Sequence, residues 1–580
     1  MEELTNSKIA SMLREVAAVY TIKKANLFQI RAYETAADNI EKTSIEIQDL
    51  WEEGKLDQIP GVGPSLQEHL NELFKTGKVK HWEEVKQGIP KQVFDFLDIP
   101  GVGPKTALEL ADLGVKNIED LKDQIKTGEL VGKGFSAKIA EKIMAGVEEL
   151  SSIRSGRILL PYAFAQAQKV LDYLKTDPSI IKADVLGSLR RMVPTIGDLD
   201  FSVASNNPKK TVEHIIKMPG ISRIVDQGEA KVTIALNSGL SLDFLIVASN
   251  VYGALLQHFT GSKSHNIHLR SYAQSVGLSL SEYGVKDIKT NKTKETPTEK
   301  EFYSLLGMDS PPPELREDTG EIEAGLEYKL PKLVNLQDIK GDLHLHSNFP
   351  LEPSHSPGAN NIKEIVEAAK KKGYSYIGIS DHSPSFTNHT PEQIVKLIKK
   401  RSEAIEQINY SIKDIRVLNL LEIDILPDGS LSVPDEGLKL LDFALAGIHS
   451  SHRMEKDKMT KRILKALANP YVKVLTHPTG RILNERSSYE ADWVEVFKYT
   501  AKNNKALEIN SHPNRLDLTD KLIKEAKAYG VKFVINTDSH ELSQMDNMQF
   551  GVATARRGWA TKEDIVNNLN LTALEKWYNN

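Results

Sequence analysis

The stretch that decides the fold of this 580-residue chain is Gly187-Ser188-Leu189-Arg190-Arg191, followed by Gly197-Asp198-Leu199-Asp200. Asp198 and Asp200 are two positions apart, so on a strand both carboxylates extend from the same face. A third carboxylate, Asp243, interrupts an apolar run, where a charge is costly unless it is paired or binds a metal. Like charges this close repel, and divalent cations between them relieve the repulsion. Three acids around two metal ions form the arrangement that in-line phosphoryl transfer needs.

Asp-x-Asp alone is a weak signal, because two turn acids after a glycine give the same pattern. The Gly-Ser element before it and the strand acid behind it favour metal binding, and the whole set resembles the nucleotidyltransferase core of family X DNA polymerases. The resemblance implies that Asp198 and Asp200 hold both metal ions, Mg²⁺ or Mn²⁺. It implies that Asp243 binds the catalytic ion and helps to deprotonate the primer 3′-hydroxyl. The implied contacts to the incoming triphosphate are Gly187, Ser188, Arg191 and Gly197.

The segment His258-Phe259-Thr260-Gly261-Ser262 is similar to the thumb of the same family. By that resemblance Phe259 and Gly261 pack on the nucleotide sugar, and Asn266 and Arg270 face the minor groove of the nascent pair. His258 stands where the family often has tyrosine, beside the 2′ position of the sugar, so sugar selectivity is left open. A proline-rich segment from Ser310 and the acidic run behind it indicate a chain end or a linker.

A repeat precedes this core. Ile59-Pro60-Gly61-Val62-Gly63-Pro64 recurs as Ile99-Pro100-Gly101-Val102-Gly103-Pro104, each time opening an amphipathic helix, with a poorer copy at 131–135. Such helix starts present unpaired amides that suit a phosphate, although two ordinary tight turns give the same pattern. The repeats resemble helix-hairpin-helix motifs, which implies DNA-backbone contacts at Gly61, Gly63, Gly101 and Gly103. His69 replaces the Schiff-base lysine of the family's lyase domain, so lyase activity is left open.

After Gly341, seven apolar strands each lead into a polar or ligand-type residue. In an α/β barrel the carboxyl ends of the strands form the rim where active sites lie. Imidazole and carboxylate ligands suit Zn²⁺, Mn²⁺ or Fe²⁺. These strings resemble the PHP (polymerase and histidinol phosphatase) family, which implies a distorted seven-stranded barrel with two or three Mn²⁺ or Zn²⁺ ions. The ligand positions carried over are His344, His346, His382, Glu422, His449, His477, Asp538 and His540.

The ninth PHP ligand departs from the family pattern. Glu352 stands at about the usual distance from the His-x-His pair, whereas His355 has the more familiar Ser-His surroundings, and His355 is preferred. Arg481 and Arg515 lie in strings shared with the PHP branch that is fused to family X polymerases. Each is expected either to hold a substrate phosphate or to be a solvated surface arginine.

Composition bounds the remaining possibilities. The chain has no cysteine, which excludes disulfides, thiolate metal sites and cysteine nucleophiles, and its net charge of −5 argues against a polybasic nucleic-acid binder. The first residues lack the layout of a signal peptide, and no apolar run approaches the ~20 residues of a membrane span. We therefore expect a cytoplasmic protein without membrane contact, and a monomer by default.

The resulting prediction is a multidomain protein with helical N-terminal helix-hairpin-helix domains, an α+β nucleotidyltransferase palm and thumb, and a C-terminal distorted (β/α)7 PHP barrel. The predicted boundaries are a lyase-like domain (1–85), a fingers-type subdomain (86–152), palm (153–254), thumb (255–325), linker (326–337) and PHP phosphoesterase domain (338–580). The resemblance implies a polymerase that fills short gaps in gapped or nicked DNA from dNTPs during base excision repair.

The PHP resemblance adds a 3′–5′ exonuclease, with cleavage at abasic sites and removal of 3′-blocking groups as further family activities. Three alternatives stay open. The polymerase half could be inactive and only deliver a phosphoesterase to DNA, the nuclease could be impaired at its ninth ligand, or the chain could be a non-enzymatic DNA-end binder.

Overall fold

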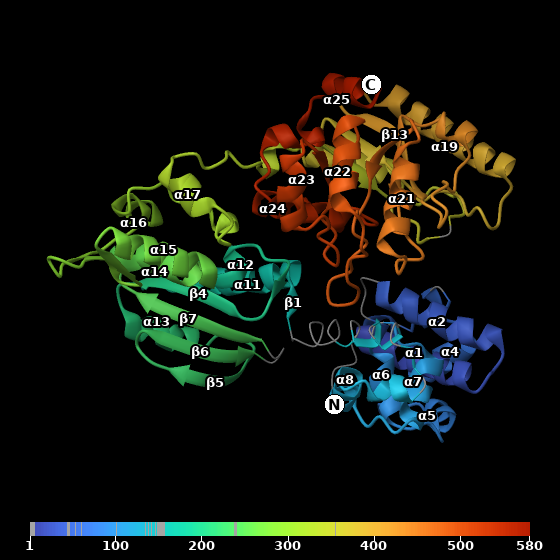
Figure 1. Ribbon diagram of the computed structural model, residues 1–580, viewed down its shortest axis with the longest axis horizontal. Coiled ribbons are helices and arrows are strands. Elements are labelled where there is room, and N and C mark those ends of the chain that lie inside the picture. Colours follow the sequence, from blue (N-terminus) through green and yellow to red (C-terminus); the bar gives the residue numbers. More distant parts are fainter. Residues whose placement is uncertain are drawn as a thin grey trace. The chain divides into compact units, whose positions relative to one another are not determined.

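The computed structural model describes residues 6–42, 47–52, 54–59, 61–99, 101–133, 135–136, 139–140, 142–144, 147, 157–236, 240–353 and 355–579. It consists of two compact units, Met1–Ser155 and Gly156–Asn580 (Figure 1). Among the described residues, no helix is both long enough and apolar enough to cross a membrane.

The first unit contains helices and turns throughout its described part, as the apolar spacing predicts. One group packs around Leu70, Leu73 and the buried Trp82. It comprises α1 (Asn6–Ile22), α2 (Leu27–Lys42), α3 (Ile47–Glu52), η1 (Leu56–Gln58), α4 (Pro64–Thr76) and α5 (Lys80–Lys86). A second group packs around Phe96 and Leu110. It comprises α6 (Gln92–Leu97), α7 (Pro104–Asp112), α8 (Ile118–Lys126) and α9 (Glu129–Gly132).

The palm is a five-stranded sheet in the order β2-β4-β7-β6-β5, drawn in green in Figure 1. Its strands are β2 (Ile180–Val185), β4 (Leu199–Ser205), β5 (Ile221–Gln227), β6 (Lys231–Leu236) and β7 (Ser241–Val247), accompanied by β1 (Ile158–Leu159), α11 (Leu160–Leu174), α12 (Gly187–Arg190), β3 (Thr195–Ile196) and α13 (Pro208–Ile215). In β7 the alternate residues Leu242, Phe244 and Ile246 are buried, so Asp243 belongs to the other, less buried face. Strands β4 and β7 are parallel neighbours.

The thumb follows the palm directly. It comprises η2 (Ser249–Val251), α14 (Tyr252–Thr260), α15 (Lys263–Ser275), β8 (Leu278–Ser281), β9 (Gly284–Asp287), β10 (Thr293–Lys294), α16 (Glu299–Leu305), η3 (Pro313–Leu315) and α17 (Glu321–Leu326). The interpretation of the segment after Ser310 as a chain end or linker is wrong. Arg316 and Glu321 are almost fully buried there, and each has a partner. Arg316 pairs with Glu299, and Glu321 binds His265 at 2.6 Å. Buried charges need partners, and these partners fix the segment to the thumb.

The C-terminal part is a barrel of seven parallel strands in sequential order, as predicted. The strands are β11 (Gly341–Leu345), β12 (Tyr376–Ile379), β13 (Arg416–Asp424), β14 (Phe443–Gly447), β15 (Val472–Leu475), β16 (Ala506–Asn510) and β17 (Lys532–Asn536). A bridge between Leu345 and Ser539, with the His346 amide donating to the Ser539 carbonyl at 2.9 Å, brings the two edge strands together.

The helices of this part surround the barrel, and the last of them packs on a cluster of strand residues, Leu343, Leu420 and Phe443, that is separate from the main core (Figure 1). They are η4 (Leu336–Asp338), α18 (Ile362–Lys371), α19 (Pro391–Ser411), α20 (Asp435–Leu438), α21 (Lys456–Leu467), α22 (Trp493–Lys502), α23 (Asp520–Ala528), η5 (Leu542–Asn547), α24 (Met548–Arg557), η6 (Lys562–Asp564), η7 (Val566–Asn568) and α25 (Leu571–Asn579). Phe550 of α24 and the loop residue Leu516 are buried in the same apolar cluster as the palm residues Leu160 and Leu199. The palm and the PHP barrel therefore share part of one core.

Candidate active sites

The three predicted polymerase carboxylates meet at the palm sheet. Asp200 of β4 lies directly opposite Asp243 of β7 in the parallel ladder. Burial, followed by the charges of Asp198 and Asp243, raises the pKa of Asp200 to about 6. The Thr233 hydroxyl donates to Asp243, and Lys231 lies 3.6 Å from the same carboxylate. A single lysine leaves most of this repulsion in place, which is the electrostatic setting of a divalent-cation site.

Gly187 lies so close to the Asp200 side chain that glycine is the residue type that fits at this position. Its φ is +56°, and a Cβ there would lie 2.6 Å from the Asp200 carboxylate oxygen Oδ2. The Leu186 amide donates to the Asp200 carbonyl at 2.8 Å, which holds the Gly-Ser turn against β4. Ser188 follows in the short helix α12, and Gly197 lies beside the Arg157 guanidinium. Of the predicted triphosphate residues, Gly187 is thus adjacent to Asp200, and Ser188 follows it in sequence.

Arg191 points to the thumb and is already paired. Its Nε donates to Glu317 Oε1 at 2.9 Å, and its Nη1 donates to the Thr260 carbonyl. The backbone of Gly261 lies against the same guanidinium, where a Cβ would come within 3.2 Å of Nη1. A triphosphate would therefore have to compete with Glu317 for this arginine.

The predicted nascent-pair residues differ in their freedom to contact DNA. Asn266 is held inside the thumb, accepting from Gln257 Nε2 at 2.9 Å and donating to the His258 carbonyl at 2.7 Å. Arg270 is exposed, and Phe259 is partly buried. Burial lowers the pKa of His258 from its ordinary value, although Glu282 opposes this effect. His258 is therefore neutral near pH 7 beside the predicted sugar position.

The predicted PHP histidines and carboxylates converge on Glu422 at the end of β13. Its Oε1 lies 2.7 Å from His477 Nε2 and 3.1 Å from His449 Nε2, and its Oε2 lies 3.0 Å from His382 Nδ1. Within the part of the chain that the structure describes, four overlapping groups could each hold an ion: His344, His346, Glu422 and Asp538; His346, His382 and His540; His382, Glu422 and His449; and His355, Asp424 and His449. Burial alone would raise the pKa of Glu422, but the surrounding imidazoles hold it well below its usual range.

The donor set fits metal ions. Among the described residues, two buried ring nitrogens of this cluster, His346 Nδ1 and His477 Nδ1, have no hydrogen-bond or ion-pair partner, and His344 Nε2 lies 3.2 Å from Glu422 Oε2 without hydrogen-bond geometry. Buried polar atoms normally have partners, and orphaned ones in a cluster of imidazoles and carboxylates indicate bound cations. The palm acids fit divalent cations by the repulsion described above.

The structure separates the two candidates for the ninth ligand. The Glu352 side chain is 71% exposed and pairs with His389, outside the cluster. The His355 ring lies 4.7 Å from the His382 ring and 4.6 Å from the His449 ring, centroid to centroid. The preference for His355 thus agrees with its place among the ligand-type side chains.

Two acidic residues that support the cluster were missed by the sequence analysis. Asp424 Oδ1 lies 2.6 Å from His449 Nδ1 and 3.1 Å from His355 Nε2. Glu508 is fully buried, and its Oε1 lies 2.7 Å from His344 Nδ1. Such carboxylates orient metal-binding imidazoles. Asp424 stands two positions after Glu422, so strand alternation alone was the signal that could have found it.

The two arginines with open roles are now distinguishable. Arg481 Nε donates to the Arg515 carbonyl at 2.8 Å, and its Nη2 donates to the Leu516 carbonyl. Arg481 therefore stabilises the loop rather than facing substrate. Arg515 is partly exposed, with Nε 3.7 Å from Asp538 Oδ2 at the ligand cluster. Arg515 therefore lies at the ligand cluster and is not a fully solvated surface arginine.

Both predicted DNA-backbone contact sites lie at helix starts, as expected. Gly63 and Gly103 are the N-caps of α4 and α7, without a side-chain cap, and an added Cβ at either would meet nothing within 4 Å. Gly61 and Gly101 have φ of +79° and +91°, the left-handed region that favours glycine. The prolines before them, Pro60 and Pro100, and Gly134 of the poorer third copy lie outside the described residues.

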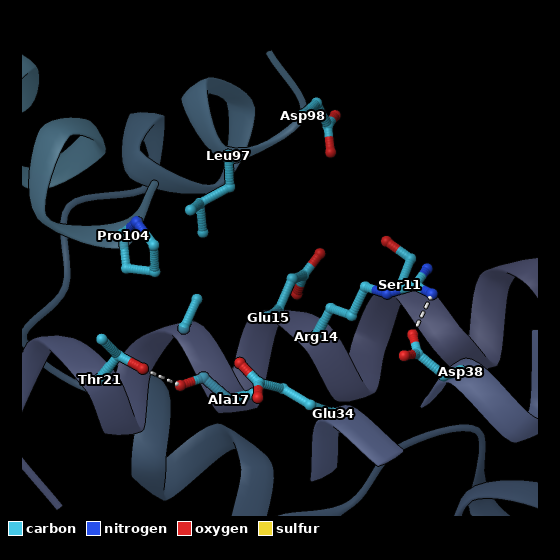
Figure 2. Close-up of a pocket in the computed structure, with 11 residues that line it drawn as sticks. Ser11, Arg14, Glu15, Ala17, Thr21, Glu34, Asp38, Leu97, Asp98 and Pro104 are labelled. Atoms are coloured by element: carbon cyan, nitrogen blue, oxygen red, sulfur yellow. Dashed lines mark hydrogen bonds and ion pairs between the residues drawn. The ribbon is translucent and has the colours of Figure 1, made fainter. Parts of the chain in front are cut away.

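His69 belongs to a ring cluster and not to a lysine-type nucleophilic site. Its Nδ1 lies 3.1 Å from the Tyr33 hydroxyl, and its ring stacks on His81 with centroids 5.0 Å apart. A cleft of about 540 Å³ in the same unit lies between α1 and the turn before α7 (Figure 2). Among the described residues that line it, Glu15, Glu34, Asp38 and Asp98 are acidic, and Arg14 donates to Asp38. This acidic cleft does not suit a DNA phosphate.

Comparison with known proteins adds independent findings. Family models match at residues 4–79 (helix-hairpin-helix domain), 93–149 (SAM-like helix-hairpin-helix tandem), 255–317 (DNA polymerase beta thumb) and 342–512 (PHP domain). The DNA polymerase/3′-5′ exonuclease PolX of Bacillus subtilis (strain 168) is 34% identical over 571 residues, 98% of each chain. A probable phosphatase of Thermoanaerobacter sp. (strain X514) is 26% identical over 41% of this chain and 93% of its own. A probable phosphatase of Caldicellulosiruptor bescii is 29% identical over 31% of this chain and 73% of its own.

Proposed function

Because this chain belongs to the family of the DNA polymerase/3′-5′ exonuclease PolX, it joins a metal-dependent family X DNA polymerase to a PHP exonuclease, and we propose that it fills short gaps during base excision repair. Its substrates are then gapped or nicked DNA and dNTPs. The observation that carries the polymerase assignment is the placement of Asp200 opposite Asp243, with Asp198 close enough to raise the Asp200 pKa.

In the polymerase reaction, Asp198, Asp200 and Asp243 would hold Mg²⁺ or Mn²⁺. When bound, these ions neutralise the charge that develops on the transferred phosphoryl group. Asp243, which lies opposite Asp200 in the parallel ladder, helps to deprotonate the primer 3′-hydroxyl. Gly187 leaves room for the triphosphate next to the acids, and Ser188 and Arg191 bind its oxygens.

In the exonuclease reaction, the histidine-rich rim around Glu422 would hold two or three Mn²⁺ or Zn²⁺ ions. When bound, such ions polarise the phosphodiester and lower the pKa of water toward neutrality. Glu508 and Asp424 keep the imidazoles of His344 and His449 in the orientation that directs their other nitrogen at the cluster. Arg515 binds a phosphate of the substrate beside Asp538.

The helix starts at Gly63 and Gly103 bind the DNA backbone through their free amides. They contact phosphate and no base edge, so this binding is independent of sequence. The acidic balance of the chain is compatible with such binding because amides, not lysines, supply the contact.

The test uses a labelled primer on a one-nucleotide gapped duplex with Mn²⁺, in the presence and absence of dNTPs. Wild type should extend the primer with dNTPs and shorten it without them. Asp198→Ala with Asp200→Ala should lose extension alone, and His344→Ala should lose shortening alone. His389→Ala is the matched control, since His389 pairs with the exposed Glu352 outside the cluster.

The same assay decides the competing functions. Extension without shortening would show an impaired nuclease, which the position of His355 among the ligands disfavours. Shortening without extension would show a phosphoesterase that the polymerase half only delivers to DNA. If neither extension nor shortening occurs, the remaining function is that of a DNA-end binder. The complete sets of carboxylates and imidazoles argue against this outcome.

A further inference from the structure

A chain of alternating charges links the palm to helix α24 of the PHP barrel. Arg191 Nε donates to Glu317 Oε1 at 2.9 Å, and Arg557 Nη1 donates to the same oxygen at 2.9 Å. Arg557 Nη1 also donates to the Arg191 carbonyl at 2.8 Å, and its Nη2 donates to Asp520 Oδ2 at 2.5 Å. The order along the chain of charges is Arg191, Glu317, Arg557 and Asp520, which we call the charge relay.

The arginines of the charge relay are largely shielded from solvent. The Arg557 side chain is 6% exposed and that of Arg191 is 14% exposed, so neither ion pair is weakened by full solvation. Burial alone would lower the pKa of Arg557, but Asp520 and Glu317 raise it above its ordinary value. Helix α24 is held to the palm by edge-to-face packing of Phe550 on Phe164, with ring centroids 5.7 Å apart.

Glu317 faces a competition whenever a triphosphate enters the palm. The phosphates carry several negative charges and attract Arg191, which must then leave Glu317. A half-buried carboxylate that loses its only cation is strongly destabilised. Arg557 removes this difficulty, because it remains bound to Glu317 and to Asp520 after Arg191 has moved.

We propose that Arg557, a residue of the PHP barrel, is a positioning residue for the polymerase: it neutralises Glu317 and so frees Arg191 to bind the triphosphate of the incoming dNTP. The inference rests on the proposed role of Arg191. It makes the nuclease domain a direct determinant of nucleotide affinity in the polymerase site, although Arg557 contacts no substrate itself.

The experiment measures kcat and KM for the dNTP in single-nucleotide extension by the full chain on the gapped duplex. Arg557→Gln should raise KM about tenfold and change kcat less than twofold, because Glu317 then retains Arg191 in the absence of substrate. Arg556→Gln is the matched control. Arg556 is the adjacent arginine of α24 and pairs with Glu314 at 2.7 Å without touching the charge relay. Its KM should stay within twofold of wild type.

The double variant separates positioning from folding. Glu317→Gln removes the competing carboxylate, so its KM should equal that of wild type or lie below it, and adding Arg557→Gln should then change nothing. A purely structural role for Arg557 would instead lower kcat and exonuclease activity, with no rescue by Glu317→Gln.

Two results would overturn the inference. The first is an unchanged KM in Arg557→Gln, and the second is an equal rise in KM with or without Glu317→Gln. Arg191→Gln distinguishes the two levels of the argument. If it raises KM while Arg557→Gln does not, only the present inference fails. If Arg191→Gln leaves KM unchanged, the proposed role of Arg191 fails as well.

Discussion

Replacing Glu299 by glutamine should loosen the contact between thumb and palm. Glu299 accepts from Arg190 through both carboxylate oxygens, at 2.9 and 2.6 Å, and from Arg316 Nη1 at 2.5 Å. Arg190 is in the Gly-Ser motif of the palm, whereas Glu299 and Arg316 are in the thumb. The substitution keeps the shape of the side chain but leaves two largely buried guanidinium groups without a countercharge.

The magnitude follows from the pKa of Glu299. Burial alone would raise this pKa, but Arg316 and Arg190 outweigh burial and lower it from 4.5 to about 2. That fall corresponds to about 3 kcal/mol of stabilisation by the ionised carboxylate at neutral pH. Because the folded-state pKa is depressed, this contribution is present above about pH 4.5 and is lost as the pH falls toward 2.

The assay must report on the palm and thumb alone, because a chain with several domains does not unfold in one step. None of the five tryptophans lies within residues 153–325, and Trp559, which donates to Thr319 Oγ1 at 3.1 Å, belongs to the PHP barrel, so intrinsic fluorescence does not report on the palm and thumb alone. Hydrogen exchange of α16 peptides at neutral pH reports on the palm and thumb. A loss of about 3 kcal/mol predicts roughly 100-fold faster exchange in Glu299→Gln.

Glu301→Gln is the control, since Glu301 lies on the same helix and caps it by accepting from Thr298, as glutamine also does. It removes one negative charge without touching either arginine, and its exchange should stay within about threefold of wild type. Exchange of Glu299→Gln within that same threefold range would refute the reasoning. The reasoning would also be refuted if lowering the pH accelerated hydrogen exchange equally in Glu299→Gln and in wild type.

Three further predictions concern the sites. Gly187→Ala should abolish primer extension and spare exonuclease activity, because the new methyl group would displace Asp200; unchanged extension would contradict this. His355→Ala should lower both bound metal, measured by mass spectrometry of the native protein, and exonuclease activity, whereas Glu352→Ala should change neither. Gly103→Glu should weaken binding to gapped duplex about tenfold in a filter assay without loss of stability, since a carboxylate there repels phosphate; undiminished binding would remove that helix start from the DNA interface.

The sequence was sufficient for the architecture. Strand alternation predicted that Asp198 and Asp200 share a face, although β4 begins only at Leu199, and the repeated pattern of an apolar run ending in His or Glu predicted the barrel and its rim. Both are local signals, because a strand or a helix start is specified by neighbouring residues. The segment after Ser310 was misread for the same reason, since His265, the buried partner of Glu321, lies 56 residues away.

Only the tertiary structure decided the choices that depend on partners distant in the sequence. His355 and Glu352 are three positions apart, and only the path of the chain brings His355 to His449 and sends Glu352 to His389. Arg191 finds Glu317 126 residues away and Arg557 366 residues away. Sequence spacing fixes the direction of a side chain within its own element. The packing of elements against one another decides which charge that side chain meets, because burial makes an unpaired charge costly wherever it occurs along the chain.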